Sequence, residues 1–144
     1  MKENIVIFKQ DITDIPTYND GHFKLYQIKQ KEIKGTAYPI EYLVEFQDKK
    51  ETGTDYNEIW YEELSLTDRL KFEAEERKKK ITYKIRIPQL KEIDSLCVVE
   101  IDGKYHKIFN AYHFTNKDGF KQTDLTLEEY PRAKFEKDVI KNDD

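Results

Sequence analysis

The chain has 144 residues and a mass of 17.3 kDa, enough for one domain with a single core but too little for two. Charged residues make up 38% of it and hydrophobic residues 38%, so we expect part of the chain to be poorly buried by itself, either as an exposed arm or as a surface meant for neighbouring molecules. The net charge of −4 argues against a nucleic-acid-binding protein, because such proteins usually carry a basic field. The 10 Tyr and 8 Phe are typical of β-strands.

Cysteine content and hydropathy limit the possible compartments. Cys97 is the single cysteine, which excludes an intrachain disulfide and a cysteine-based metal site and favours the cytoplasm. No stretch approaches the roughly 20 apolar residues that span a bilayer. The apolar run IVIF at 5–8 is too short for a signal peptide, whose apolar region runs about 7–15 residues. We therefore expect no membrane association.

Residues 1–38 are predicted to form an extended N-terminal arm or an added hairpin. Within them, IVIF at 5–8 is a candidate short strand, and DIPTYNDG at 14–21 has the composition of a turn. The stretch HFKLYQIKQ at 22–30 alternates as a strand does. KEIKGTAYP at 31–39 then breaks this pattern, so we place a domain boundary there.

Clear alternation of apolar and polar residues begins after Pro39. The stretch IEYLVEF at 40–46 predicts a strand, with its even-numbered residues on the apolar face. A polar loop at 48–57 separates it from a second predicted strand, EIWYEEL at 58–64.

The period then changes, and residues 65–80 predict a helix. Ser65 followed by Asp68 approximates a capping box at its start. The apolar residues at helical spacing are Leu66, Leu70 and Ala74. Because this stripe is thin, we expect most of the helix to face solvent or another molecule. The run RKKK at 77–80 would end the helix and complement its dipole, or else contact a phosphate backbone or an acidic partner.

Strands return in the remaining sequence. The predicted strands are 81–87, 96–101, 104–114 and 120–130. Asp102 and Gly103 supply the two positive φ angles of a type I′ turn, which predicts a tight hairpin. Residues 39–130 therefore form a mainly β domain, a small antiparallel barrel or sandwich of about six or seven strands with one helix. Residues 131–144 are predicted to be a charged, flexible tail.

Residues that could support catalysis or metal binding do not form a recognisable constellation. His106 and His113 are seven positions apart on one predicted strand, which would place them on opposite faces, and His22 is remote in sequence. Cys97 has apolar neighbours and is predicted to be a buried, unreactive thiol. The chain also lacks a glycine-rich phosphate loop and the GxSxG and HExxH motifs. We therefore expect no enzymatic activity, no cofactor and no metal.

The order of these segments resembles the head–tail connector proteins of long-tailed bacteriophages, the head-closure, stopper or head–tail joining family. The matching segments are IWYEELSLTDRLKFEAEERKKK (59–80), ITYKIRI (81–87), VEIDGKYHKI (99–108) and a last strand ending in LTLEE (125–129). The resemblance covers about residues 40–130, and residues 1–38 have no counterpart in the family. A related tail-completion protein of the neck is therefore an alternative.

The resemblance implies a β-barrel subunit of a ring, expected to be dodecameric, in the virion neck after assembly in the host cytoplasm. Such a ring closes the DNA channel below the portal, or below an adaptor ring, and offers a docking surface to the tail. The residues it marks as candidates for contact with a partner or the channel are Asp68, Arg69, Lys71, Glu73, Glu75, Glu76, Arg77, Lys78, Lys79 and Lys80. The residues it marks as structural are Trp60, Asp102 and Gly103. An OB-like barrel that binds single-stranded nucleic acid is an alternative from a different class.

Overall fold

The computed structural model describes residues 15–47 and 53–141, so the candidate strand at 5–8 lies outside the described residues. The strands are β1 (Gly21–Lys31), β2 (Ile40–Glu45), β3 (Ile59–Leu64), β4 (Ile81–Pro88), β5 (Cys97–Ile101), β6 (Lys104–Thr115) and β7 (Lys121–Glu129). The helices are α2 (Asp68–Glu76) and α3 (Glu136–Lys141). In the described part of the chain, neither helix has the length and apolar character needed to cross a membrane.

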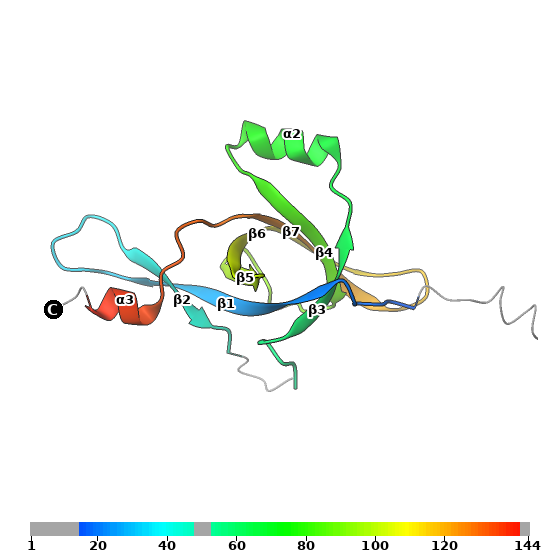
Figure 1. The fold of residues 1–144 in the computed structure, drawn as a ribbon, viewed down its shortest axis with the longest axis horizontal. Coiled ribbons are helices and arrows are strands. Elements are labelled where there is room, and N and C mark those ends of the chain that lie inside the picture. Colours follow the sequence, from blue (N-terminus) through cyan, green and yellow to red (C-terminus); the bar gives the residue numbers. More distant parts are fainter. Residues whose placement is uncertain (1–14, 48–52, 142–144) are drawn as a thin grey trace, which may run out of the picture.

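The strands form one antiparallel sheet that closes on itself (Figure 1). The order β1–β3–β4–β7–β6–β5 returns to β1 through a β1–β5 pairing, and β2 is added beyond the ring on the second half of β1. The closure is uneven, since β1 pairs with β3 over Gly21–Phe23 alone, whereas β6 and β7 are paired along most of their length. The predicted mainly β, antiparallel fold is confirmed.

Strand β1 corrects the predicted domain boundary. It pairs with β3 through its first residues, with β5 through Lys24–Gln27 and with β2 through Tyr26–Lys31. Phe23 and Leu25 are each 1% exposed and lie in the main core. Residues 21–31 are therefore a strand of the barrel and not part of an arm, and β1 forms a hairpin with β2, which the prediction placed in the barrel domain.

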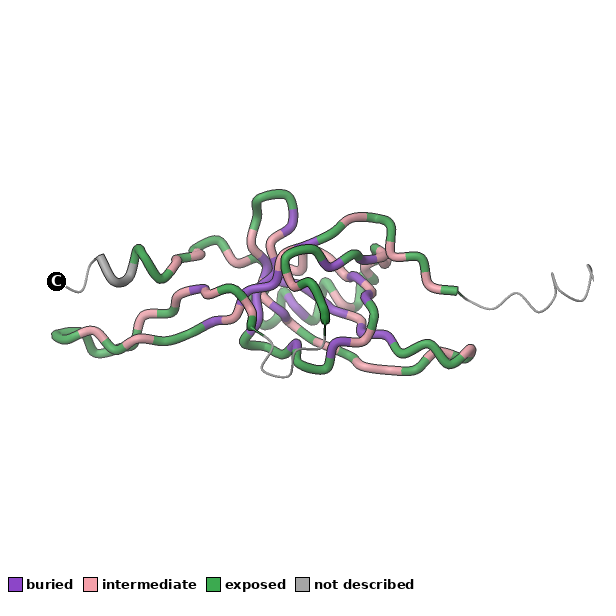
Figure 2. The backbone as a smooth tube through the Cα atoms, turned by 90° about the horizontal axis from the view of Figure 1, so that it is seen from below, coloured by how far each residue is buried: buried purple, intermediate pink, exposed green. Residues whose placement is uncertain are grey.

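Apolar residues gather in two clusters, one on each side of β1 and β5. The main cluster fills the barrel and includes Leu25, Ile85, Val99 and Leu127. The second, built on Tyr26, Ile28, Leu43 and Val98, lies on the opposite faces of the same strands. Because β5 is covered on both faces, its first three residues, Cys97, Val98 and Val99, are all apolar and buried rather than alternating. Figure 2 shows the buried residues concentrated at the centre of the molecule, with the hairpin tips exposed.

The C-terminal segment covers this second cluster, so the prediction of a flexible tail is wrong for the described residues after 130. The Phe135 ring lies 5.6 Å from each of the rings of Tyr26 and Tyr105, edge to face in both cases. The Leu43 backbone N–H donates to the Lys134 carbonyl at 2.7 Å, which fixes the segment along β2. The free energy gained by packing Phe135 against these rings outweighs the effect of the charged residues, which had predicted an unstructured tail.

Helix α2 begins and ends at other residues than predicted. Its N-cap is Thr67, whose hydroxyl accepts from the Leu70 N–H at 3.2 Å, so the predicted capping box at Ser65 is wrong. The helix ends at Glu76 because Lys78 takes a left-handed conformation (φ 57°), and the Lys79 N–H then donates to the Ala74 carbonyl. The basic run thus lies mostly beyond the helix. Ala74 is the buried residue of α2, which confirms the thin apolar stripe.

The predicted hairpin turn is confirmed. Asp102 (φ 51°) and Gly103 (φ 77°) both have positive φ, and Ile101 pairs with Lys104 across the turn. This two-residue connection fixes the register of β5 against β6.

Replacing Phe135 with Ala tests whether the C-terminal segment is part of the fold. We expect the free energy of unfolding, measured by urea denaturation, to fall by about 2–3 kcal/mol, less than for a fully buried aromatic residue because Phe135 is partly exposed. The control is Phe72→Ala on the exposed side of α2, where Phe72 is 62% exposed, with an expected change within about 0.5 kcal/mol. Equal effects of the two substitutions would contradict the packing of Phe135 against the second cluster.

Candidate functional site

A β-bulge in β6 determines which of its side chains face outward. The register shifts between Ile108 and Asn110, so that Ile108 pairs with Leu127 and Ala111 pairs with Leu125. Both partners are core residues, so Ile108 and Ala111 face inward although an odd number of positions separates them. Beyond the bulge, Asn110 and Tyr112 face outward.

The same bulge overturns the prediction that the two histidines of β6 lie on opposite faces. His106 is 4% exposed, and its Nδ1 lies 2.8 Å from the Thr82 hydroxyl. His113 Nδ1 lies 2.7 Å from the hydroxyl of Thr123, which is fully buried. Both histidines therefore lie on the inner face, held by different threonines. Within the described ranges, no group of three or more potential metal ligands is present.

The outward-facing residues of β4, β7 and β6 form two rows across the sheet. Arg86 pairs with Asp124, which pairs with Tyr112, and the next row joins Lys84, Thr126 and Asn110 in the same way. Helix α2 stands over this face (Figure 1) and leaves a groove of about 440 Å³ between them. We call this region the α2 groove. Its residues are Thr67, Arg69, Leu70, Glu73, Lys84, Asn110, Tyr112, Asp124 and Thr126.

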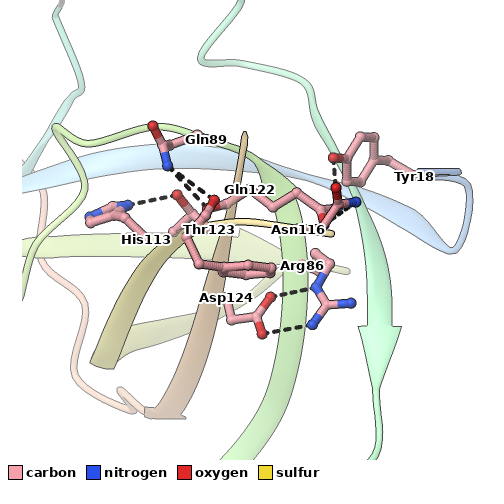
Figure 3. Close-up of polar contacts among 9 residues, drawn as sticks. Tyr18, Arg86, Gln89, His113, Asn116, Gln122, Thr123 and Asp124 are labelled. Carbon is pink, nitrogen blue, oxygen red and sulfur yellow. Dashed lines mark hydrogen bonds and ion pairs between the residues drawn. The ribbon is translucent and has the colours of Figure 1, made fainter. Parts of the chain in front are cut away.

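Arg86 and Asp124 form the strongest ion pair of the groove region (Figure 3). Two parallel hydrogen bonds join them, at 2.7 Å from Nε and 3.0 Å from Nη2, and they raise the pKa of the Arg86 guanidinium. The guanidinium also lies 5.0 Å above the centre of the Phe114 ring. Phe114 in turn stacks on Tyr112, with ring centres 5.3 Å apart and planes 12° from parallel. The result is a packed surface of one cation and two aromatic rings.

Polar side chains tie the neighbouring segments to this surface (Figure 3). The Gln122 amide donates to the Tyr18 hydroxyl at 3.0 Å, and Gln89 donates to the Phe114 carbonyl at 3.3 Å. Burial raises the pKa of the Tyr18 hydroxyl, which stays protonated. These contacts hold the chain before β1 and the loop after β4 against the β6–β7 hairpin.

The ten residues predicted to contact a partner or the channel lie on α2 and the turn that follows it, and all ten are exposed. Arg69 and Glu73 form an ion pair of 3.1 Å at the mouth of the α2 groove. In the basic run, Lys79 pairs with Glu128 at 3.4 Å, while the Arg77 guanidinium lies 5.9 Å from the centre of the Phe109 ring. The exposed residues Asp68, Lys71, Glu75, Glu76, Lys78 and Lys80 complete the set.

Trp60 lies on the surface rather than in the core. It is 45% exposed on the outer face of β3, and its ring centre lies 4.9 Å from that of His22. Cys97 is buried as predicted, and burial raises its pKa to about 12.

Sequence reasoning missed the sheet side of the groove. In the sequence, Lys84, Arg86, Tyr112 and Asp124 are only parts of predicted strands. A signal is present at Lys84 and Arg86, which alternate with the apolar residues of ITYKIRI and so must share one outer face. Tyr112 carries no such signal, because the bulge in β6 sets its direction.

Comparisons with known proteins do not identify the chain: no family model matches it, and no curated protein matches it.

Replacing Asp124 with Asn tests how much the Arg86–Asp124 pair stabilises the fold. Removing the carboxylate leaves Arg86 half-buried without its partner, so we expect a loss of about 1–3 kcal/mol in the free energy of unfolding. The matched control is Glu45→Gln, which breaks the more exposed pair with Lys24 and should cost less than about 1 kcal/mol. A cost for Asp124→Asn no larger than that of the control would contradict a structural role for the pair.

Stability should also depend on the protonation of His106. Burial, and next the charge of Lys104, lower its pKa below 6.5, while Glu129 acts in the opposite direction. As pH falls, His106 therefore binds a proton in the unfolded chain before it does so in the folded protein. The stability contributed by the neutral ring is fully present above pH 6.5 and is lost as pH falls through the folded-state pKa. Urea denaturation between about pH 8 and pH 5 should show a steeper loss for the natural protein than for His106→Asn. Parallel curves would show that His106 does not titrate differently in the folded state.

Proposed function

We propose that the protein is a virion structural component of the neck of a tailed phage, where a ring of its copies closes the portal DNA channel and joins head to tail. Its partners would be the portal or an adaptor ring on one side and tail components on the other. The sequence resemblance suggests this role, and the shape of the subunit supports it.

The observation that carries the proposal is the exposed helix α2. It is held away from the barrel between β3 and β4 (Figure 1), and a single residue of it, Ala74, is buried. On its outer side Phe72 is 62% exposed, and the exposed basic run follows directly. A helix that buries so little apolar area against its own domain gains little stability from it, so contact with another molecule is the best explanation of its place in the fold.

Two hairpins extend from opposite ends of the barrel and fit the same role. The β1–β2 hairpin and the β6–β7 hairpin project in opposite directions along the long axis (Figures 1 and 2). Tyr38 near the first tip is 82% exposed, and Tyr112 on the second hairpin is 59% exposed. Different surfaces at opposite ends of a subunit suit heterologous contacts, in which one end of each copy binds the other end of the next copy. Such contacts can close into a ring.

A binding module for single-stranded nucleic acid is the second candidate. The stacked rings of Tyr112 and Phe114 beside Arg86 are the kind of surface on which bases stack. The bidentate pairing with Asp124 already neutralises Arg86, however, and the chain is acidic overall. The neck role is therefore preferred, and salt-dependent binding of single-stranded DNA by the isolated protein would favour the alternative.

Binding to heads tests the proposal directly. DNA-filled, portal-bearing heads of the phage that encodes the protein should bind it and sediment with it. The triple charge reversal Lys71→Glu, Arg77→Glu and Lys78→Glu should weaken this binding at least ~tenfold and leave the thermal unfolding midpoint unchanged, because all three positions are exposed. Lys79 is left intact because it pairs with Glu128.

The control reverses three exposed charges outside α2 and the two hairpins, Lys91, Arg132 and Lys137, and so changes the net charge equally. This variant should bind heads like the natural protein. If both variants weaken head binding equally, the effect is one of net charge and not of the α2 region. If the natural protein does not bind heads, the proposed role is rejected.

A further inference from the structure

A small apolar pocket lies beside Trp60, and we call it the Trp60 pocket. Its volume is about 240 Å³, and its apolar lining includes Ile59, Pro88 and Leu90. Ile59 and Leu90 are each 7% exposed, whereas Trp60 is 45% exposed and its ring lies 4.9 Å from that of His22. Pockets for small molecules usually begin at about 300 Å³, so this pocket is better suited to one large side chain.

Two further lining residues connect the Trp60 pocket to the base of the β6–β7 hairpin (Figure 3). The Tyr18 hydroxyl accepts from the Gln122 amide at 3.0 Å, and the Gln89 amide donates to the Phe114 carbonyl at 3.3 Å. These hydrogen bonds fix the walls before any partner arrives. A preformed pocket binds without the cost of ordering its own side chains.

The β1–β2 hairpin presents an aromatic side chain of matching kind. Tyr38 is 82% exposed, more than any other large hydrophobic residue in the described part of the chain. The turn before it is held by Thr36, whose backbone N–H and hydroxyl both donate to the Ile33 carbonyl, at 3.1 and 2.7 Å. A tyrosine on such a turn is already positioned for a partner, and tyrosine and tryptophan are the residues that most often dominate the energy of an interface.

Tyr38 is too far away to occupy the Trp60 pocket of its own chain. Strand β1 pairs with β3 beside Trp60 through its first residues and enters the turn of Tyr38 after its last. Its 11 residues span up to about 35 Å in an extended strand. Figure 1 shows the β1–β2 hairpin extending away from the end at which β1 meets β3. Only a second copy of the chain can therefore bring these two features together.

The charges around the two features are complementary. The end of the β1–β2 hairpin, residues 29–39, carries three lysines and one glutamate. The lining of the Trp60 pocket includes the exposed carboxylates of Asp55 and Glu58 and, among the described residues, no basic side chain. Opposite charges on two facing surfaces speed their association and orient them.

We propose that Tyr38 of one copy inserts into the Trp60 pocket of the next copy, with the basic hairpin end against Asp55 and Glu58. Each copy offers the hairpin at one end and the pocket at the other, so the contact repeats from copy to copy and can close into a ring. It names the surface through which copies of the proposed ring bind one another, and in that respect it rests on the proposed function.

Sedimentation equilibrium of the purified full chain, at concentrations up to about 1 mM, tests the contact. The average mass should rise with concentration and pass that of a dimer. Tyr38→Ala should weaken this self-association at least ~tenfold without affecting the fold, because Tyr38 is exposed. The control Phe72→Ala removes another exposed aromatic ring and should behave like the natural protein. No rise in mass, a rise that ends at the dimer, or equal effects of the two substitutions would overturn the proposal.

A disulfide between two variants tests whether the two ends meet. Ala37→Cys in one chain and Glu58→Cys in a second chain, mixed and oxidised, should give a cross-linked pair, and adding Tyr38→Ala to the first chain should reduce its yield. Cys97 does not compete, because it is 1% exposed. Equal cross-linking of Ala37→Cys to the control Glu75→Cys on α2 would contradict the contact.

Heads are absent from both experiments, so this contact and the neck role can fail separately. Natural protein that binds heads but does not self-associate would overturn the contact and leave the neck role standing. Natural protein that self-associates through Tyr38 but does not bind heads would reject the neck role and support the contact.

Discussion

The pairing of β1 with three other strands is the constraint on which the rest of the structure depends. Its first residues pair with β3, its middle with β5 and its second half with β2. The β1–β5 contact turns an open sheet into a closed one, which removes two edges that would otherwise be free to pair with other chains. The remaining protrusions, α2 and the two hairpins, are held in fixed directions by this closed body.

Closure also explains the two apolar clusters. Since β1 and β5 cross the middle of the molecule, Val99 faces the barrel while Val98 faces outward, and both are fully buried. The outward cluster needs a cover, which the segment around Phe135 supplies. The C-terminal segment therefore packs on the apolar surface that ring closure leaves on the outside of the barrel. Its charged side chains face solvent.

Local features of the fold could be predicted from sequence, while long-range ones could not. Alternation and the Asp102-Gly103 turn indicated the strands and one hairpin correctly, because both signals act over a few residues. The membership of residues 21–31 in the barrel depends on pairing with residues more than seventy positions away, as in Lys24 with Glu100. The bulge near Asn110 reverses the direction of every later side chain in β6, and one extra residue in a strand leaves no trace in its composition. For the candidate site, the charged side of α2 was predicted and the sheet side was not.

Hydrogen exchange along β1 tests the closed barrel most directly. If β1 closes the ring, the amides of Lys24–Gln27 and of their partners in β5 should exchange as slowly as those of the central β4–β7 pair, in the global-unfolding class. Rapid exchange at Lys24–Gln27 beside slow exchange in β4 and β7 would instead mean that residues 21–31 are a detachable arm, and would contradict the closed barrel.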